Sequence, residues 1–279
     1  MSTRLRTCWT VFRFRGPDNP VLNRILSLLF GAVLLVFVFW CFQAIGRQVH
    51  VTQYGLHHGG DYFAKLFPHS KADWRYALKL GPDLWQPLIE TVQMAVVGTV
   101  AGMLLAFPVS FIAARTSSIP GPVIAVVKTF LNMARAVPTL IYALLVIPLA
   151  GLGAQTGAIA IGIATFISLA KLYAEALESV SVGPIEAVRS AGGNAPQVFV
   201  YAMLPQVFPL YLSTTLYSLE YNLRDSFVVG IVGAGGLGQK LSNAVNLFEW
   251  LDAGVIIALV IVLVNIVDYF SYRVRKVFS

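Results

Sequence analysis

The sequence predicts an all-α integral membrane protein with six transmembrane helices, and three observations support this fold class. The chain of 279 residues is 57% hydrophobic and only 12% charged, with a mean hydropathy of +0.73. Soluble domains contain about 45–50% apolar and about 25% charged residues, so this composition does not suit a water-exposed surface. Six apolar stretches are long enough to cross a bilayer, and a more polar stretch separates the fourth from the fifth.

The first span is expected at 25–45, because about 20 apolar residues cross the hydrocarbon core as a helix. This stretch is longer than a typical signal-peptide core and no small-residue cleavage site follows it, so we expect a retained helix. A basic segment, 1–24, precedes it. The loop 46–87 follows, and its Trp74 and Trp85 favour an interfacial helix that leads into the second span.

The other five spans are expected at 88–114, 122–149, 156–175, 207–232 and 253–272. An even number of spans leaves both termini on one side of the membrane. Of the 20 Lys and Arg residues, eleven then fall on the side of the termini, counting Lys171 near the end of the fourth span, six fall on the far side and three lie within other spans. Because Lys and Arg accumulate on the cytoplasmic side, we expect both termini in the cytoplasm and the loop 46–87 on the outer side of the membrane.

The same distribution explains the net charge of +7 without a nucleic-acid partner, since the basic residues sit beside apolar runs. Cys8 and Cys41 fall at opposite ends of the first span, which predicts free thiols.

The polar segment 176–206 predicts two short helices joined by a glycine turn on the cytoplasmic side. Pro184 suits a first helical position, which places Glu186 in the first turn, where the helix dipole favours an acid. Gly192, with the Gly and Asn that follow it, is expected to end this helix. A second helix should start near Pro196 and end at Leu204 and Pro205.

The third span carries polar residues at steps of four and three, which places them on one helical face. These residues are Lys128, Asn132, Arg135, Thr139 and Tyr142. Lys128 can reach the interface, whereas Arg135 lies near mid-membrane and Pro138 should kink the helix just beyond it. Intramembrane ionisable residues are functional candidates. Two interpretations stand: a cationic path or gate for an anion, or a structural Arg bonded to carbonyls or to an acid on another helix.

The fifth span contains a second polar group. Glu220 and Arg224 are spaced i,i+4 in the favourable order for an ion pair, and Asn222 and Asp225 form an adjacent i,i+3 pair. In one interpretation, the opposite charges within these pairs neutralise each other in the membrane. In another, they form a charged ring between two copies of the chain. The two interpretations are compatible.

A literal G-x-G-x-x-G stands at Gly233, Gly235 and Gly238, the fingerprint of a dinucleotide-binding turn. That fingerprint requires a strand, a turn and a helix in a soluble βαβ unit, whereas here the apolar run before it ends a membrane span. We therefore expect a glycine-rich turn or re-entrant segment, including Gly236, at an outer gate, where non-helical backbone is tolerated only inside protein or at a cavity.

The segment from Glu186 to Pro205 resembles the EAA loop of permease subunits of bacterial ABC importers. Glu186 and Ala187 match the start of the motif, Gly192 matches its glycine, and its end is matched by Leu204 and Pro205, all at the family's spacing. Two positions differ: Val188 replaces the third residue of the motif, an alanine, and Ala202 replaces an isoleucine. The resemblance implies a type I ABC importer transmembrane domain at 88–279 whose loop docks on a cytoplasmic ATPase. It also implies a bacterial inner membrane, with the loop 46–87 in the periplasm.

Longer stretches resemble the phosphonate-type branch of these permeases. These are ARAVPT at 134–139, EALESVSVGPIEAVRSAGGN at 175–194, the segment 204–238 with its E-x-N-x-R-D run, and LVNIVDYFSYRVRK at 263–276. This resemblance implies transport of phosphonate or a related phosphorus oxyanion such as phosphite, hypophosphite or a phosphate ester. It also implies a homodimer of the chain, two ATPase subunits that use ATP and Mg, and a periplasmic binding protein. A methionine-like or other amino-acid importer is the alternative.

Other function classes are less well supported. No P-loop and no nucleophile–base arrangement is present, so the chain is expected to be non-catalytic, with no cofactor of its own. The histidines of the outer loop lack accompanying Cys residues and predict no metal site; they are His50, His57, His58 and His69. Two alternatives come from other function classes: an ion-coupled secondary transporter, and a membrane enzyme that uses the glycine motif to bind a dinucleotide.

Overall fold

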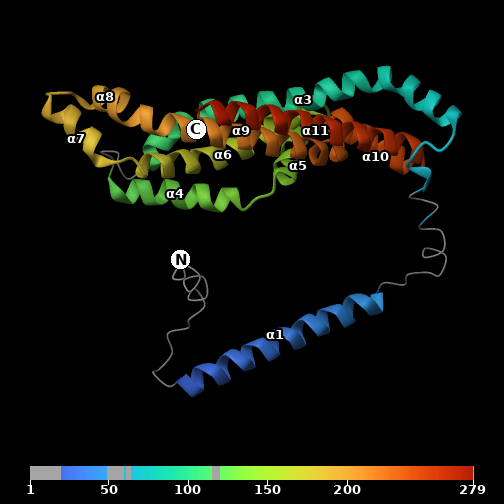
Figure 1. Cartoon of the computed structure of the whole chain (residues 1–279), viewed down its shortest axis with the longest axis horizontal. Coiled ribbons are helices and arrows are strands. Elements are labelled where there is room, and N and C mark those ends of the chain that lie inside the picture. The colour runs from blue at the N-terminus through green and yellow to red at the C-terminus, as the bar shows by residue number, and fades with distance from the viewer. Residues whose placement is uncertain (1–19, 49–59, 61–63, 115–119, 279) are drawn as a thin grey trace, which may run out of the picture. The chain divides into compact units, whose positions relative to one another are not determined.

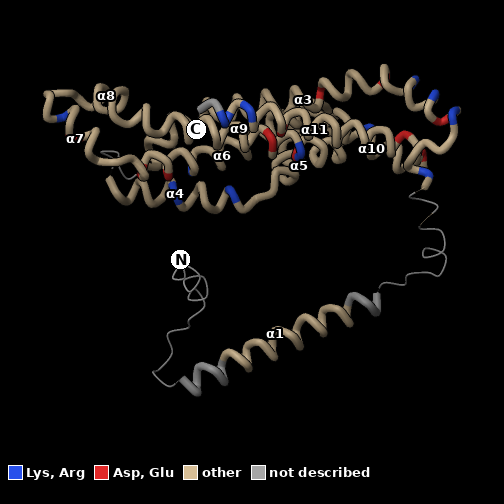
Figure 2. Tube along the Cα trace, viewed as in Figure 1, with Lys and Arg blue, Asp and Glu red and all other residues tan. Residues whose placement is uncertain are grey.

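The computed structural model describes residues 20–48, 60, 64–114 and 120–278, and it divides into two units, Met1–Gly60 and Asp61–Ser279. The first unit contains α1 (Pro20–Gln48), whose 29 residues span about 43 Å at about 1.5 Å per residue, more than the hydrocarbon core requires. Its residues from 27 to 44 include no charge (Figure 2). Their side chains are mostly exposed, as a membrane span requires. Most of the predicted segment 1–24 lies outside the described residues, as do Cys8 and three of the four histidines.

The second unit is helical throughout its described residues. Figure 1 shows α3, α6, α9 and α11 running alongside one another, with α7 and α8 at one end of this bundle and α10 towards the other. The elements are α3 (Lys71–Ala113), α4 (Gly121–Arg135), α5 (Thr139–Ala150), α6 (Ala154–Glu178), α7 (Val182–Ser190), α8 (Ala195–Val198), the π-helical η1 (Phe199–Met203), α9 (Leu204–Val229), the π-helical η2 (Gly230–Ala234), α10 (Gly236–Asn246) and α11 (Trp250–Phe278).

Among the described residues, five helical segments are long and apolar enough to span a membrane, and α4 with α5 makes a sixth if the bent pair is one span. The boundaries differ from the sequence expectation at the second span. Instead of an interfacial helix followed by a span from 88, α3 runs unbroken from Lys71 to Ala113. Its start is fixed by a capping box in which Ser70 and Asp73 accept each other's backbone N–H groups.

The contact between α3 and α6 is the most extensive between two helices of this unit. A Cβ added to Gly102 would lie 2.7 Å from Thr165 Cβ and 2.9 Å from the carbonyl oxygen of Gly162, and one added to Gly98 would lie 2.7 Å from Ile161 Cγ2. Membrane helices associate mainly through such close packing, because lipid is as apolar as the helix surface. The glycines of α3 therefore set how near α6 can lie.

The expected third span is not one continuous helix. Residues 136–138 break it, and α4 and α5 meet at an angle of 89°. Pro138 explains the break, because it lacks an N–H and disfavours helical geometry in the residue before it. The expectation that five polar residues share one helical face is therefore wrong for Thr139 and Tyr142, which belong to α5.

The glycine motif forms the predicted turn. Gly233, Gly235 and Gly236 have φ values of +101°, +86° and +68°, a region that favours glycine. The motif follows α9 and η2 rather than a strand, so the context that a dinucleotide fingerprint needs is absent from this part of the described chain. The predicted close backbone packing is present, since a Cβ on Gly238 would lie 2.2 Å from the carbonyl oxygen of Phe227.

Two side chains of α3 cap the start of α10. Glu90 Oε2 accepts the N–H of Gly236 at 3.1 Å, and Thr91 Oγ1 accepts the N–H of Leu237 at 2.9 Å while it donates to the carbonyl oxygen of Pro87. These bonds satisfy the first N–H groups of a helix that has no capping side chain of its own. The turn is therefore held by α3, which lies more than a hundred residues earlier in the sequence.

We expect Gly102→Ala to destabilise the protein by about 1–3 kcal/mol, because the added methyl group would overlap α6. The matched control is Gly81→Ala in the same helix, where no heavy atom lies within 4 Å of the added Cβ. Thermal unfolding in detergent checks this, and equal melting temperatures for the two variants would contradict the packing argument.

We expect Thr91→Val to destabilise the protein by about 1–3 kcal/mol, because it leaves the buried N–H of Leu237 without an acceptor. Thr91→Ser keeps the hydroxyl and should melt closer to the unmodified protein. If Val is tolerated as well as Ser, the cap does not stabilise the turn.

Candidate functional site

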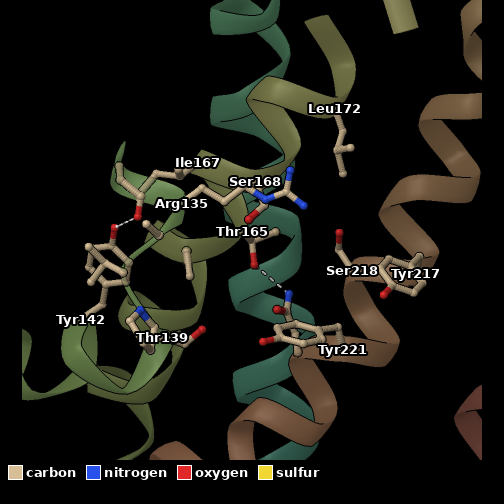
Figure 3. Close-up of a pocket in the computed structure, with 16 residues that line it drawn as sticks. Arg135, Thr139, Tyr142, Thr165, Ile167, Ser168, Leu172, Tyr217, Ser218 and Tyr221 are labelled. Carbon is tan, nitrogen blue, oxygen red and sulfur yellow. Dashed lines mark hydrogen bonds between the residues drawn. The ribbon is translucent and has the colours of Figure 1, made fainter. Parts of the chain in front are cut away.

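A cavity of about 460 Å³ opens at the break between α4 and α5. Its walls come from the end of α4, the start of α5, and the middle parts of α6 and α9 (Figure 3). Its polar side chains are Arg135, Thr139, Tyr142, Thr165, Ser168, Tyr217, Ser218, Tyr221 and Asn222. One cation among eight neutral polar groups would suit a small anion or a polar molecule better than an apolar ligand.

Arg135 is the last residue of α4, and Figure 3 shows its side chain reaching towards Ser168. Within the described part of the chain its guanidinium makes no hydrogen bond or ion pair. This arrangement favours the first of the two sequence interpretations, a cationic path or gate, over an Arg locked to an acid on another helix. A guanidinium donates up to five hydrogen bonds and suits phosphate-like oxygens.

The backbone beside Arg135 is held by the cavity's own residues. Tyr142 donates its hydroxyl hydrogen to the carbonyl oxygen of Ala134 at 2.7 Å, across the break. The N–H groups of Ala136 and Val137 bond to carbonyls of the preceding turn of α4. The non-helical stretch therefore leaves few backbone groups unsatisfied, as a membrane interior requires.

Two other residues of the polar face predicted for the third span, Lys128 and Asn132, do not line the cavity. Lys128 forms an ion pair with Glu178 at the end of α6. Asn132 is exposed on α4 and does not line the cavity. Arg135 and Thr139, by contrast, come together there although the helix between them is broken.

Asn222 lines the cavity and is 4% exposed. Its amide nitrogen donates to Thr99 on α3 and to Thr165 on α6, at 2.7 Å each. The predicted Asn222–Asp225 pair is therefore wrong, because the amide of Asn222 bonds to threonines on two other helices.

The predicted ion pair within α9 is also wrong. Glu220, 8% exposed, pairs with Arg275, and Arg224 pairs with Asp268 at 2.8 Å; both partners lie on α11. Neither Glu220 nor Arg224 lines the cavity. A spacing of four allowed a pair along α9, but the packing of α11 against α9 supplies counter-charges across the interface.

The predicted two-helix segment is present as α7 and α8. Gly192 has a φ of +83°, and Asn194 caps α8 through a capping box with Gln197. No residue of α7 is buried, so Glu186 and Ala187 lie on a free surface of the described chain. Two details differ. Helix α7 begins at Val182, so Glu186 lies beyond its first turn. Leu204 and Pro205 begin α9 rather than end a helix, since proline fits a helix start.

Sequence reasoning missed most hydroxyl residues of the cavity. On α9 a signal was available: Ser218, Tyr221, Asn222 and Asp225 recur at steps of three, one and three, along one helical face. On α6, Thr165 and Ser168 are single polar residues in an apolar run, and only the approach of α9 makes them part of a site. Glu90 and Thr91 also escaped notice, because nothing local links them to the glycine turn.

Comparison with known proteins gives the same architecture. The family described as binding-protein-dependent transport system inner membrane component matches residues 77–275. The phosphite transport system permease protein PtxC of Stutzerimonas stutzeri is 37% identical over 194 residues, 70% of each chain. The phosphate-import permease protein PhnE of Mycolicibacterium smegmatis is 37% identical over 198 residues, 71% of this chain and 37% of that protein.

A solved structure described as an inward-facing conformation of the MetNI methionine ABC transporter resembles the fold, with a TM-score of 0.63 at 22% identity over 70% of this chain and 96% of that one. The family match covers the broken span, the cavity, the two-helix segment and the glycine turn. The chain belongs to the family of binding-protein-dependent transport system inner membrane components.

Proposed function

We propose that the chain translocates phosphonate or a related phosphorus oxyanion, such as phosphite, hypophosphite or a phosphate ester, as the permease of an ATP-driven importer. The observation that carries this proposal is Arg135, a cation free of partners in the described chain, in a polar cavity between the helices. The two relatives above are named for phosphite and for phosphate, which share the tetrahedral oxyanion chemistry that a guanidinium recognises.

A methionine-like or other amino-acid importer is the alternative. The likeness to the methionine transporter is 22% in sequence and supports the fold alone. The described residues that line the cavity include one cation, Arg135, and no acidic side chain that could bind an α-amino group. An oxyanion is therefore the better match.

The proposed assembly has two copies of this chain, two cytoplasmic ATPase subunits that use ATP and Mg²⁺, and a periplasmic binding protein that delivers the substrate. Both termini are placed in the cytoplasm, which puts α7 and α8 on the ATPase side. The glycine turn, with Gly233, Gly235 and Gly236, then lies towards the periplasm and forms part of the outer gate. Figure 1 supports this arrangement, since α7 and α10 lie towards opposite ends of the bundle.

The segment proposed to bind the ATPase is directly connected to the two helices that carry part of the cavity wall. Helices α7 and α8 connect α6 to α9, and these two helices carry Ser168, Ser218 and Asn222 of the cavity wall. A displacement of the exposed segment that contains Glu186 and Gly192 would therefore move both walls. The proposed role of Leu204 and Pro205 is to pass this movement directly into α9, which they begin.

We expect Arg135→Gln to lower ATP-dependent uptake of phosphite or methylphosphonate by about tenfold to a hundredfold, because a charge-assisted bond to the oxyanion is lost. Lys128→Gln is the matched control on α4, since Lys128 pairs with Glu178 away from the cavity. Uptake is measured in proteoliposomes with the ATPase and binding protein, with methionine as a competitor. Equal uptake by the two variants, or competition by methionine alone, would exclude the proposal.

We expect Gly192→Val to abolish most substrate-stimulated ATP hydrolysis while the melting temperature changes little. A branched residue in the left-handed region distorts the turn at a cost of about 1–2 kcal/mol, but α7 contributes no buried residue to the core. Gly183→Val is the control, because Gly183 has no positive φ and open space around its Cβ. Normal coupling in the Gly192 variant would show that the segment does not transmit the signal.

A further inference from the structure

The first turns of α3 pack against α10 and α11 along one face. Leu80, Leu84 and Leu88 belong to an apolar cluster with residues of α10 and α11, and Leu84 is 3% exposed. Leucines that recur every four residues lie on one face of a helix. The side chains on the other faces of this segment are mostly exposed in the described chain.

One of the exposed faces carries large apolar side chains. Trp74, Leu78 and Trp85 are 59%, 76% and 64% exposed. At about 100° per residue they fall within about 40° of one another around the helix. They therefore form an apolar stripe, and such a surface is more stable when it is covered than when it faces water.

This apolar stripe continues into the part of α3 that packs against α6. Ile89, Val96 and Val100 are exposed, and at about 100° per residue they lie on the same side of the helix as Trp85. In a membrane span this side faces lipid. The continuity favours lipid, rather than a second protein, as the cover of the apolar stripe.

A basic stripe runs beside the apolar one. Lys71, Arg75 and Lys79 recur every four residues and are exposed, and Figure 2 shows Lys and Arg gathered along the start of α3. No ion pair of the described chain involves them. Of the two acids in this segment, Asp73 is engaged by the capping box and Asp83 follows the last cation by about one turn. The basic stripe therefore remains available to anions.

A hydrogen bond relates the depth of the basic stripe to the span of α11. Tyr76, which lies between Arg75 and Lys79, donates its hydroxyl hydrogen to Asp252 in the first turn of α11, at 3.4 Å. The residues of α11 that follow Asp252 are apolar as far as Asn265. The basic stripe thus lies where the apolar part of a neighbouring span begins, which is the level of lipid headgroups and the level that Trp side chains favour.

We propose that residues 71–85 bind anionic phospholipids at the end of the bundle away from α7 and α8, an inference that does not depend on the solute transported. The apolar stripe inserts at the boundary between headgroups and acyl chains. The basic stripe binds the phosphate groups of the headgroups. A Lys or Arg close to an anionic lipid surface strengthens binding by about fivefold.

The test measures which lipids contact Trp85. The full chain, with its other tryptophans replaced by Phe, is reconstituted in phosphatidylcholine vesicles that contain brominated phosphatidylcholine or brominated phosphatidylglycerol. Bromine quenches tryptophan fluorescence on contact, so the two titrations give the relative affinity of the lipids at this position. We expect both lipids to quench Trp85, and the anionic lipid to bind about fivefold or more tightly at low ionic strength.

Variants assign this preference to the basic stripe. Arg75→Gln combined with Lys79→Gln should bring the affinity ratio close to one and leave quenching by phosphatidylcholine unchanged. Arg75→Lys combined with Lys79→Arg is the matched control, because it keeps both charges and should keep the preference. Arg189→Gln, an exposed position on α7, should also keep it.

A second measurement makes the result independent of the tryptophan replacements. The same variants in the chain with all its tryptophans are purified in a neutral detergent, and the phosphatidylglycerol that remains bound is quantified. We expect the double Gln variant to retain several times less of this lipid than the charge-conserving variant. Equal retention by the two would count against the proposal.

Three outcomes of the quenching experiment would overturn the proposal. Absence of quenching by either lipid would show that the apolar stripe does not face the membrane. Equal affinity for the two lipids would remove the role of the basic stripe. If inorganic phosphate abolished the preference and sodium chloride at the same ionic strength did not, the stripe would be a site for free anions rather than for headgroups.

Discussion

The close packing of α3 against α6 is the contact on which the remaining structure depends. Gly98 and Gly102 have no room for a Cβ, so the two helices approach nearly to backbone contact. That approach brings Thr99 and Thr165 within 2.7 Å of one amide nitrogen, that of Asn222, and so places α9 against the pair. Lipid offers no alternative hydrogen bonds to these groups. The hydrogen bonds of Asn222 therefore specify how the three helices are positioned relative to one another, which apolar packing alone specifies less strictly.

Two departures from helical geometry form the candidate site and the glycine turn, and at each of them the backbone is hydrogen-bonded inside the protein. At 136–138 the chain turns by 89°, and Tyr142 bridges back to α4. At the glycine turn, Glu90 and Thr91 bind the first N–H groups of α10. Since unpaired backbone groups cost several kcal/mol in hydrocarbon, each break is stable only because another helix supplies its partners.

Charges within the spans are divided into two groups. Glu220 and Arg224 are neutralised by α11, through Arg275 and Asp268, and so strengthen a helix interface. Arg135 faces a cavity and keeps its hydrogen-bonding capacity within the described chain. The same residue type thus serves structure in one place and the proposed transport path in the other, according to which helix lies opposite.

The sequence by itself determined the membrane class, five apolar spans and a sixth if the bent pair is one span, the two-helix segment around Gly192 and the turn at Gly235. Composition, hydropathy and glycine geometry are local properties. It also identified Arg135 as a candidate site residue and Pro138 as the cause of a kink just beyond it. Tertiary structure decided the partners of Glu220, Arg224 and Asn222, and it assembled the cavity. The physical reason is that the spacing along one helix predicts which residues share a face. Which side chains of another helix contact that face depends on how the helices pack.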